Sequence, residues 1–185
     1  MKRITIKKNE EKVIPLLWTG EETELSYDIK LAGVGAKIIF LGLLLGKANQ
    51  SLNLQIKVEH QMPQTTSNVV IKGALTESSK VEIDGLVKIN PGAKGTNAWL
   101  AAHLLLLSEK AKGKAVPSLE ILENDIKAGH ATTVGRINDL EMFYLMSRGL
   151  SKDTAKKLIV EGFLQEMIGN FPKKLADKAG KEINL

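Results

Sequence analysis

Cysteine is absent from the 185-residue sequence, and aromatic residues are scarce. Without a thiol, the chain forms no disulfide and cannot hold a zinc–thiolate site or an iron–sulfur cluster through its own side chains. Phe, Trp and Tyr make up 4% of the residues, too few for the aromatic platforms that bind single-stranded nucleic acid. The net charge is +5, but the lysines are interleaved with acidic residues. We therefore expect an ordinary solvated surface and no nucleic-acid partner.

Long hydrophobic runs are also lacking. The longest, "IIFLGLLLG" from Ile38 to Gly46, is too short to span a bilayer and is typical of one or two buried strands. The N-terminal stretch MKRITIKKNEEK has no apolar region of the kind found in signal peptides. These absences, together with the missing cysteines, predict no membrane association and a cytoplasmic protein.

What the sequence does contain is an alternation of apolar and polar residues as far as about Ile137. In "SLNLQIKVEH", Leu52, Leu54 and Ile56 share one face, and "ELSYDIKL" and "KVEIDGLVKI" repeat the pattern. A period of two predicts strands with one buried face. Many short strands with no long helix between them are typical of a sandwich, a barrel or a β-solenoid, and the pattern alone does not choose among these.

The period changes to that of a helix after Asn138. Asn138 and Glu141 resemble a capping box for a short helix that Gly149 would end, and Ser151 is a candidate N-cap for the next helix. A last helix is predicted from Pro172 to Ala179. Six residues form one helical stripe, which we interpret as packing against the strands: Ala155, Leu158, Ile159, Gly162, Phe163 and Met167.

Several catalytic signatures are incomplete. "GVGAKI" lacks the third glycine of a dinucleotide loop, "GLLLGKA" lacks the hydroxyl of a phosphate loop, and neither HExxH nor GxSxG occurs. The histidines are His60, His103 and His130, none with a second histidine at metal-ligand spacing. A structural or surface role is favoured for each. It suits His130 least, because the small residues of "IKAGHATTVG" leave an imidazole open to protons and metals.

Three long motifs occur in an order that resembles the SufB/SufD family of iron–sulfur cluster assembly proteins. "HQMPQTTSNVVIKGAL" is similar to the family's H-x-x-P-x-T-x-S segment and the Lys-Gly pair that follows it. "LLLLSEKAKGKAVPSLEILENDIKAGHATTVGRIND" is similar to its LLLS…P-x-LEI…H-G-A-T-V-G stretch, and "MFYLMSRGLSKDTAKKLIVEGF" to its FYL-x-SRG…GF helices. The resemblance covers roughly residues 60–166.

The resemblance implies a mainly β fold with C-terminal helices: a right-handed parallel β-helix over residues 1–137, followed by a small helical domain over residues 138–185. It implies a SufD-like scaffold subunit without catalytic turnover. The partners would be a SufB-like subunit, or a second copy in a homodimer, and a SufC-type ATPase whose ATP-driven closure rearranges the paired interface. No cofactor would be bound by the chain alone, although a transient iron–sulfur cluster could form at the shared interface.

By the same resemblance, His130 corresponds to the family histidine near the subunit interface that helps to assemble the cluster, where a neutral imidazole can coordinate iron. The residues expected at the subunit interface are Glu120, Lys127, Ala128, His130 and Thr132. The residues expected to contact the ATPase, within the helices, are Phe143, Tyr144, Arg148, Leu158 and Phe163.

The chain departs from the family pattern at three potential ligands. Ala128 stands where SufD members often have a cysteine, Ala102 near an essential cysteine of SufB, and Ala131 at a SufB carboxylate. We therefore expect a SufD-like chain that builds no cluster as a homodimer, because iron–sulfur chemistry needs thiolates. The N-terminal helical region usual in the family is expected to be absent.

Smaller features and two alternative functions complete the expectations. Pro117 and Gly135 are interpreted as turn residues, and Thr132 and Thr133 as hydrogen-bonding along a coil. One alternative is a structural or interaction β-helix protein of the same family that has lost cluster chemistry. The other is an enzyme on a β-solenoid, which the scattered carboxylates disfavour.

Overall fold

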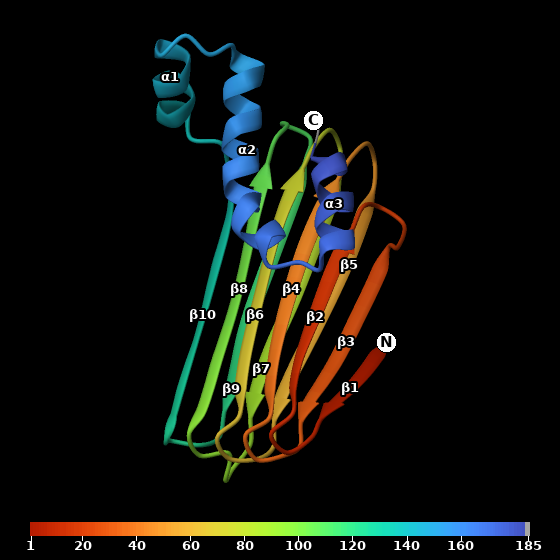
Figure 1. Cartoon of the computed structure of the whole chain (residues 1–185), viewed down its shortest axis with the longest axis vertical. Helices are drawn as coiled ribbons and strands as arrows, with labels where there is room; N and C mark the ends of the chain where they lie inside the picture. Colours follow the sequence, from red (N-terminus) through yellow and green to blue (C-terminus); the bar gives the residue numbers. More distant parts are fainter. Residues whose placement is uncertain (184–185) are drawn as a thin grey trace.

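The computed structural model, which describes residues 1–183, consists of two parallel five-stranded sheets followed by three helices (Figure 1). One sheet, here the odd-strand sheet, contains β1 (Lys2–Ile6), β3 (Glu24–Leu31), β5 (Ser51–His60), β7 (Lys80–Ile89) and β9 (Lys112–Ile121), in that spatial order. The even-strand sheet contains β2 (Glu11–Trp18), β4 (Lys37–Gly46), β6 (Thr66–Leu75), β8 (Thr96–Leu106) and β10 (Ile126–Arg136). The chain alternates between the sheets, so two successive strands make one coil. The predicted parallel β-helix followed by helices is confirmed.

The alternation in the sequence arises because equivalent residues of successive coils stack in columns. Leu25 pairs with Leu54, Leu54 with Ile83, and Ile83 with Ala115, all on the inward face of the odd-strand sheet. Each inward side chain is covered by the coil above and the coil below. A shift of one residue would move a whole strand's apolar set to the solvent, so the pattern fixes the register.

The two sheets approach closely because glycines of one face large side chains of the other. A Cβ atom on Gly85 of β7 would lie 2.7 Å from Leu100 Cδ1 of β8. Within the even-strand sheet, a Cβ atom on Gly73 would lie 2.6 Å from Leu104 Cδ2. These glycines leave room for leucines and keep the interior closely packed.

The apolar run from Ile38 to Gly46 forms one strand, β4, that is buried on both faces. Its inward residues, such as Phe40 and Leu44, belong to the core between the sheets. Its outward residues Leu41, Leu43 and Leu45 belong to a second core beneath the helices. Burial on both faces explains why this strand does not alternate.

The helices are α1 (Asp139–Ser147), α2 (Lys152–Gly169) and α3 (Lys173–Glu182), and none of the helices in residues 1–183 is long and apolar enough to cross a membrane. Both predicted N-caps are confirmed: Asn138 accepts a hydrogen bond from Leu140 N at 2.9 Å, and Ser151 from Thr154 N at 3.2 Å. Gly149 has φ of 90°, the left-handed conformation predicted after α1.

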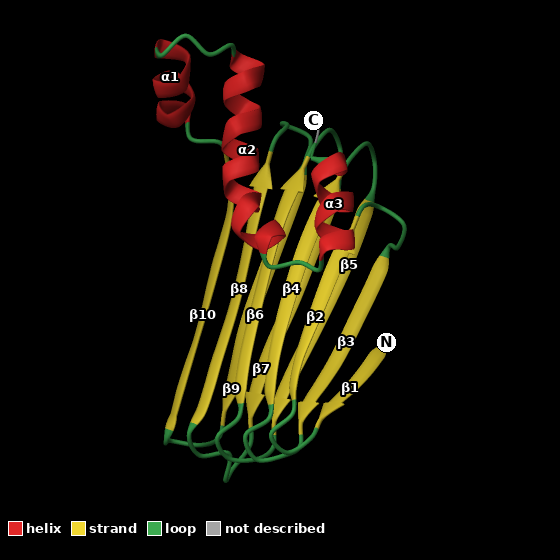
Figure 2. Cartoon of the chain, viewed as in Figure 1, coloured by secondary structure: helices red, strands yellow, loops and turns green. Residues whose placement is uncertain are grey.

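The predicted buried stripe of α2 is partly wrong. The residues buried on α2 are Ala155, Val160, Leu164 and Met167, whereas Leu158 is 49% exposed. Apolar residues occur on more than one side of this helix, and the position of β4 and β6 selects the face that is covered (Figure 2). Phe163 is half-buried beside Lys72, whose Nζ donates to the Phe163 carbonyl oxygen at 2.9 Å.

The last helix is longer than predicted, since it passes through Gly180 to Glu182. The buried side chains of Ala179 and Ile183 hold its C-terminal end against the even-strand sheet. Two ion pairs join it to turns at the top of early coils: Lys178 with Glu21 and Lys47 with Glu182, both at 3.2 Å. Tertiary packing therefore overrides the weak stop signal of a single glycine.

Pro117 and Gly135 were predicted to be turn residues, but they lie within β9 and β10. Lys112 N donates to Ser79 O, directly before β7, at 3.0 Å, and Leu122 N donates to Ile89 O, at the end of β7, at 2.9 Å. The odd-numbered residues between them therefore direct their backbone groups away from β7. Pro117 is one of these, and β9 is an edge strand. A proline there removes no bond to β7, which is why it is tolerated.

Candidate functional site

His60, the first residue of the H-x-x-P-x-T-x-S motif, is a buried structural residue, as predicted. Its Nδ1 lies 2.8 Å from Thr65 Oγ1 and its Nε2 lies 2.9 Å from Ser67 Oγ. Thr65 Oγ1 in turn lies 3.1 Å from Thr96 Oγ1 in the next coil. Burial lowers the pKa of His60 to about 4, so the ring is neutral at physiological pH. The motif therefore forms a hydrogen-bonded corner of the β-helix.

His103 is a second structural histidine, on the outer face of the even-strand sheet. Its Nδ1 lies 2.8 Å from Thr133 Oγ1 of β10, which agrees with the prediction that Thr133 bonds along a coil. Partial burial, and then the charge of Lys72, lower the pKa of His103. Burial and the Lys72 charge both disfavour the imidazolium form, so His103 serves as a neutral hydrogen-bonding residue between β8 and β10.

His130 lies at an inward-facing position of β10 but is exposed. It pairs in register with Leu100, a core residue of β8, and Ala128 two residues earlier packs against the same core. In any earlier coil, a side chain at this position would be covered by the next coil. Because β9 and β10 are the last strands, the imidazole stands at the uncovered end of the apolar interior.

We call this region the open end; it consists of the inward residues of the last two strands. They are Gly113, Ala115, Pro117, Leu119 and Ile121 of β9, and Ile126, Ala128, His130, Thr132, Val134 and Arg136 of β10. Apolar members are exposed, among them Ile121 and Val134. The open end is therefore a section through the core, with an imidazole, a hydroxyl and a guanidinium added on one strand.

The backbone of β10 also presents unpaired groups along its free edge. Asn97 N, at an outward position of β8, donates to Thr65 O at 2.9 Å, and Leu107 N, directly after β8, donates to Leu75 O at 2.8 Å, so odd-numbered residues here direct their N–H groups toward the β6 side. The same alternation in β10 directs the N–H groups of inward residues, including His130 and Thr132, away from β8. β10 has no proline, whereas Pro117 interrupts the edge of β9. β10 is thus the more continuous edge for pairing with another strand.

The five residues predicted at the subunit interface all lie in the last coil, but on two faces. Ala128, His130 and Thr132 face inward, whereas Lys127 and Glu120 face outward, with Glu120 paired to Lys88 at 2.7 Å. The three substituted positions also differ in direction. Ala128 and the buried Ala102, which pairs with Thr132, share the inward face with His130. Ala131 faces outward, so a carboxylate there would point away from His130.

The donor atoms near His130 are few. Within residues 1–183, no group of three or more histidine or carboxylate side chains is close enough to hold a metal ion. Besides the imidazole, the inward face of β10 offers the hydroxyl of Thr132 close by. A cluster at this end would need its thiolates from another molecule.

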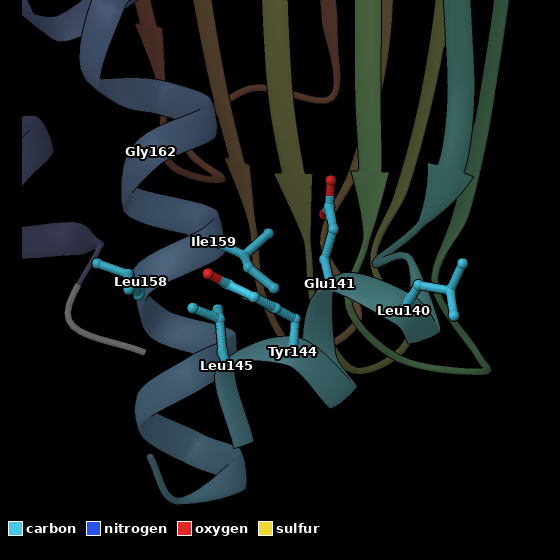
Figure 3. Close-up of a pocket in the computed structure, with 7 residues that line it drawn as sticks. All are labelled: Leu140, Glu141, Tyr144, Leu145, Leu158, Ile159 and Gly162. Atoms are coloured by element: carbon cyan, nitrogen blue, oxygen red, sulfur yellow. The ribbon is translucent and has the colours of Figure 1, made fainter. Parts of the chain in front are cut away.

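The helices provide a second candidate surface, because α1 is poorly covered (Figure 1). Leu140 is 76% exposed and Phe143 is 70% exposed, and Tyr144 and Met146 are exposed as well. The Arg148 guanidinium lies 5.2 Å from the centre of the Tyr144 ring. Figure 3 shows a groove between α1 and α2, lined by Leu140, Glu141, Tyr144, Leu145, Leu158, Ile159 and Gly162.

Four of the five predicted ATPase-contact residues lie around α1 and this groove; Phe163 does not. The Phe163 ring faces the even-strand sheet, 5.3 Å from Lys72 Nζ. Five further residues line the groove without having been predicted as contacts: Leu140, Glu141, Leu145, Ile159 and Gly162. The signal for Leu140 was present, since "DLEMFYLMS" has large apolar residues on every side of a short helix.

Comparison with known proteins supports the motif-based resemblance. The model of the SUF system FeS cluster assembly, SufBD core domain matches residues 6–163, further toward the N-terminus than the motifs alone. The chain is 35% identical to iron–sulfur cluster assembly protein SufD of Bacillus subtilis (strain 168) over 130 residues, which cover 70% of this chain and 30% of that protein. It is 36% identical to a SufBD family protein of Mycobacterium leprae over 157 residues, which cover 80% of this chain and 40% of that protein.

A second mycobacterial SufBD family protein, from Mycobacterium tuberculosis strain H37Rv, is 33% identical over 163 residues, or 84% of this chain and 41% of that protein. The chain thus spans less than half the length of these curated relatives. The residues matched by the family model run from the end of β1 into α2 and so include most of the β-helix. The chain belongs to the SufBD family of iron–sulfur cluster assembly proteins.

Proposed function

We propose that this chain is a SufD-like scaffold subunit that pairs with a SufB-like chain through its open end and binds a SufC-type ATPase through its helices. The observation that carries the proposal is the place of His130: at the uncovered end of the core, on an uninterrupted free edge. Family membership supports a role in iron–sulfur cluster assembly, and the relative named SufD supports the SufD-like assignment.

Pairing at the open end follows from what is exposed there. The apolar side chains Ile121 and Val134 belong to a core that lacks its next coil. A second β-helix placed against this end would bury those side chains, and burial contributes about 25 cal/mol per Å² of apolar area. Its edge strand would also pair with the free backbone groups of β10.

In such a pair, His130 would supply one nitrogen donor to a cluster, which is cargo and not a resident cofactor. Ala128, Gly129 and Ala131 are its near neighbours in the strand, and none has a side chain larger than methyl. A partner's thiolate can therefore approach the imidazole closely. Because positions 102 and 128 carry alanine in this chain, all sulfur ligands would come from the partner or from sulfide.

ATPase binding is assigned to α1 and the groove beside it. Contiguous exposed apolar side chains commonly mark protein-binding sites. The connection to the open end is short, since only Ile137 and Asn138 separate β10 from α1. Movement of an ATPase bound to α1 would therefore pull directly on the strand that carries His130, while the buried side chains of α2 keep that helix on the sheet.

The test is reconstitution with a cysteine-bearing SufB-type chain and a SufC-type ATPase. We expect His130→Ala to leave the complex intact, measured by sedimentation, and to lower the yield of iron–sulfur chromophore at least tenfold. His103→Asn is the matched control, because His103 lies on the outer face of the same sheet, and it should leave the yield unchanged. An unchanged yield in His130→Ala would contradict a chemical role for this residue.

The alternative function is a family β-helix that has lost cluster chemistry and only pairs. The alanines at positions 102 and 128 favour it, because the inward face around His130 has no thiolate. The same experiment separates the two. A complex that forms normally, with a chromophore yield insensitive to His130, would support the alternative.

A further inference from the structure

The outer face of the even-strand sheet carries an exposed tryptophan close to the free edge. Trp99 lies on β8 and is 45% exposed, whereas Trp18, the other tryptophan, is fully buried in the core. Trp99 pairs in register with Gly129 of the edge strand β10. A large aromatic side chain left in solvent beside an unpaired edge suggests a contact that is completed by another molecule.

The Trp99 ring lies across β10. A Cβ atom on Gly129 would be 2.6 Å from Trp99 Cζ3 and 2.9 Å from Cε3, so the six-membered ring occupies the space above Gly129. The other outward residues of β10 beyond Lys127 are also small: Ala131, Thr133 and Gly135. The tryptophan thus reaches from β8 to the last strand, over a row of small side chains.

We propose that Trp99 anchors the pairing of this chain with a second SufBD core. This inference rests on the proposed pairing through β10, to which it adds a specific residue on the outer face. Neighbouring strands lie about 4.8 Å apart, so a strand added to β10 places its outward side chains at the edge of the Trp99 ring. Tryptophans at the centre of interfaces commonly contribute a large share of the binding energy.

Because Trp99 lies beside the free edge of β10, we infer that the molecule that covers it is a second SufBD core. The unpaired backbone groups along the free edge of β10, including those of His130, need a strand as partner. The Trp99 ring lies on the outer face of β10 and not across its edge, so the edge stays open. A strand pairing with β10 would bind both features at once.

The two tryptophans allow a direct test in the wild-type protein. Trp18 is buried, so quenching of fluorescence by acrylamide reports on Trp99. Mixing with the SufB-type partner should shift the emission to shorter wavelength and lower the quenching constant several-fold. Trp99→Ala should weaken pairing about tenfold or more, measured by sedimentation, with an unchanged melting temperature because the ring is half-exposed. Gly129→Val, which displaces the ring from β10, should weaken pairing as well.

Val13→Ala is the matched control, because Val13 is 49% exposed on the same face but on β2, at the opposite edge of the sheet. It should leave the affinity unchanged. If the chains pair while Trp99 stays accessible and Trp99→Ala binds equally well, the inference is wrong and the proposed function stands. If the wild-type chain pairs with no SufBD core, its own copy included, both are overturned.

Discussion

At the scale of single residues, His60 shows how a motif histidine contributes to stability without any metal. Both ring nitrogens contact hydroxyl groups, which can donate or accept, so the neutral ring is fully bonded in the core. A charged ring would keep those contacts but lose its hydration. The low pKa of His60 is the consequence of that burial.

The stability of the protein should therefore fall between about pH 6.5 and pH 4. The unfolded chain binds a proton at His60 near pH 6.5, whereas the folded chain binds it only at about 4. As pH falls through this window, protons favour the unfolded state, and the free energy of unfolding should decrease by roughly 3 kcal/mol in total. Urea unfolding at pH 7.5, 5.5 and 4.5 measures the change.

The upper part of this window is nearly free of carboxylate effects. The lowered pKa values of Glu21, Glu59 and Glu123 place their contributions below about pH 4.5. His103 acts with the same sign as His60, so His103→Asn provides the background. The free energy of unfolding of His103→Asn should still decrease on acidification, whereas His60→Gln should show little of that decrease. A pH-independent stability above pH 4.5 in the wild type would contradict this assignment.

The sequence was enough to single out candidate residues, but not to predict what surrounds each of them in the fold. The sequence singled out His130 by its small neighbours, but its position at the end of the core depends on which strand is last. The spacing of His60, Thr65 and Ser67 is visible in the sequence, yet their hydrogen bonds require the corner to be folded. Trp99 had no local signal, because its partner, Gly129, lies one coil later.

At the scale of elements, α2 shows why periodicity alone does not select a buried face. Leu158 was predicted to be buried but is exposed, whereas Val160 and Leu164, which were not predicted to be buried, are fully buried. Leu158 instead lines the groove beside α1. The sheet selects the covered side through Leu41, Leu43 and Leu45, which are distant in the sequence.

Two leucines of the same helix test this assignment. Leu164→Ala should lower the free energy of unfolding by about 2–5 kcal/mol, because it leaves a cavity beneath α2. Leu158→Ala should lower it by less than about 1 kcal/mol while weakening ATPase binding. Chemical denaturation and a binding assay on both variants give the comparison. Equal losses of stability would mean that the buried face of α2 is assigned wrongly.

Strand prediction succeeded where one face of a strand is wet and was ambiguous elsewhere. The clear alternation of β5 gave its faces directly, whereas β4 is apolar on both sides because helices cover it. Pro117 and Gly135 were misplaced for a related reason. An edge strand tolerates residues that a central strand excludes, and edge positions are a property of the whole fold.

At the scale of the whole molecule, the two ends of the β-helix are unlike. At the N-terminal end, Lys2 and Lys12 occupy inward positions, paired in register with Tyr27 and Ile38. Inward-pointing charges on edge strands prevent further strand addition. On the open end, the inward positions up to Val134 carry no lysine or carboxylate. One end therefore favours association and the other opposes it.

We expect association to stop at two subunits, since each chain has one end suited to pairing. Lys12→Ile should make the N-terminal end apolar and produce larger, concentration-dependent assemblies in sedimentation velocity. Lys8→Ile, the same change in the exposed turn between β1 and β2, is the control and should not. If both variants remain as the wild type, inward charge is not what limits association.

The return of α3 to the early coils has a consequence for how the molecule comes apart. A stack of coils held only by nearest neighbours would open progressively from one end, first coil first. Here the final helix packs on Leu45 and reaches the turns beside Glu21 and Lys47. Opening the first coils must therefore also break the contacts of α3, which lies near the other end of the chain. We expect the early coils and α3 to unfold together and not one after the other. In hydrogen exchange, the amides of β2, β4 and α3 would then share one protection level.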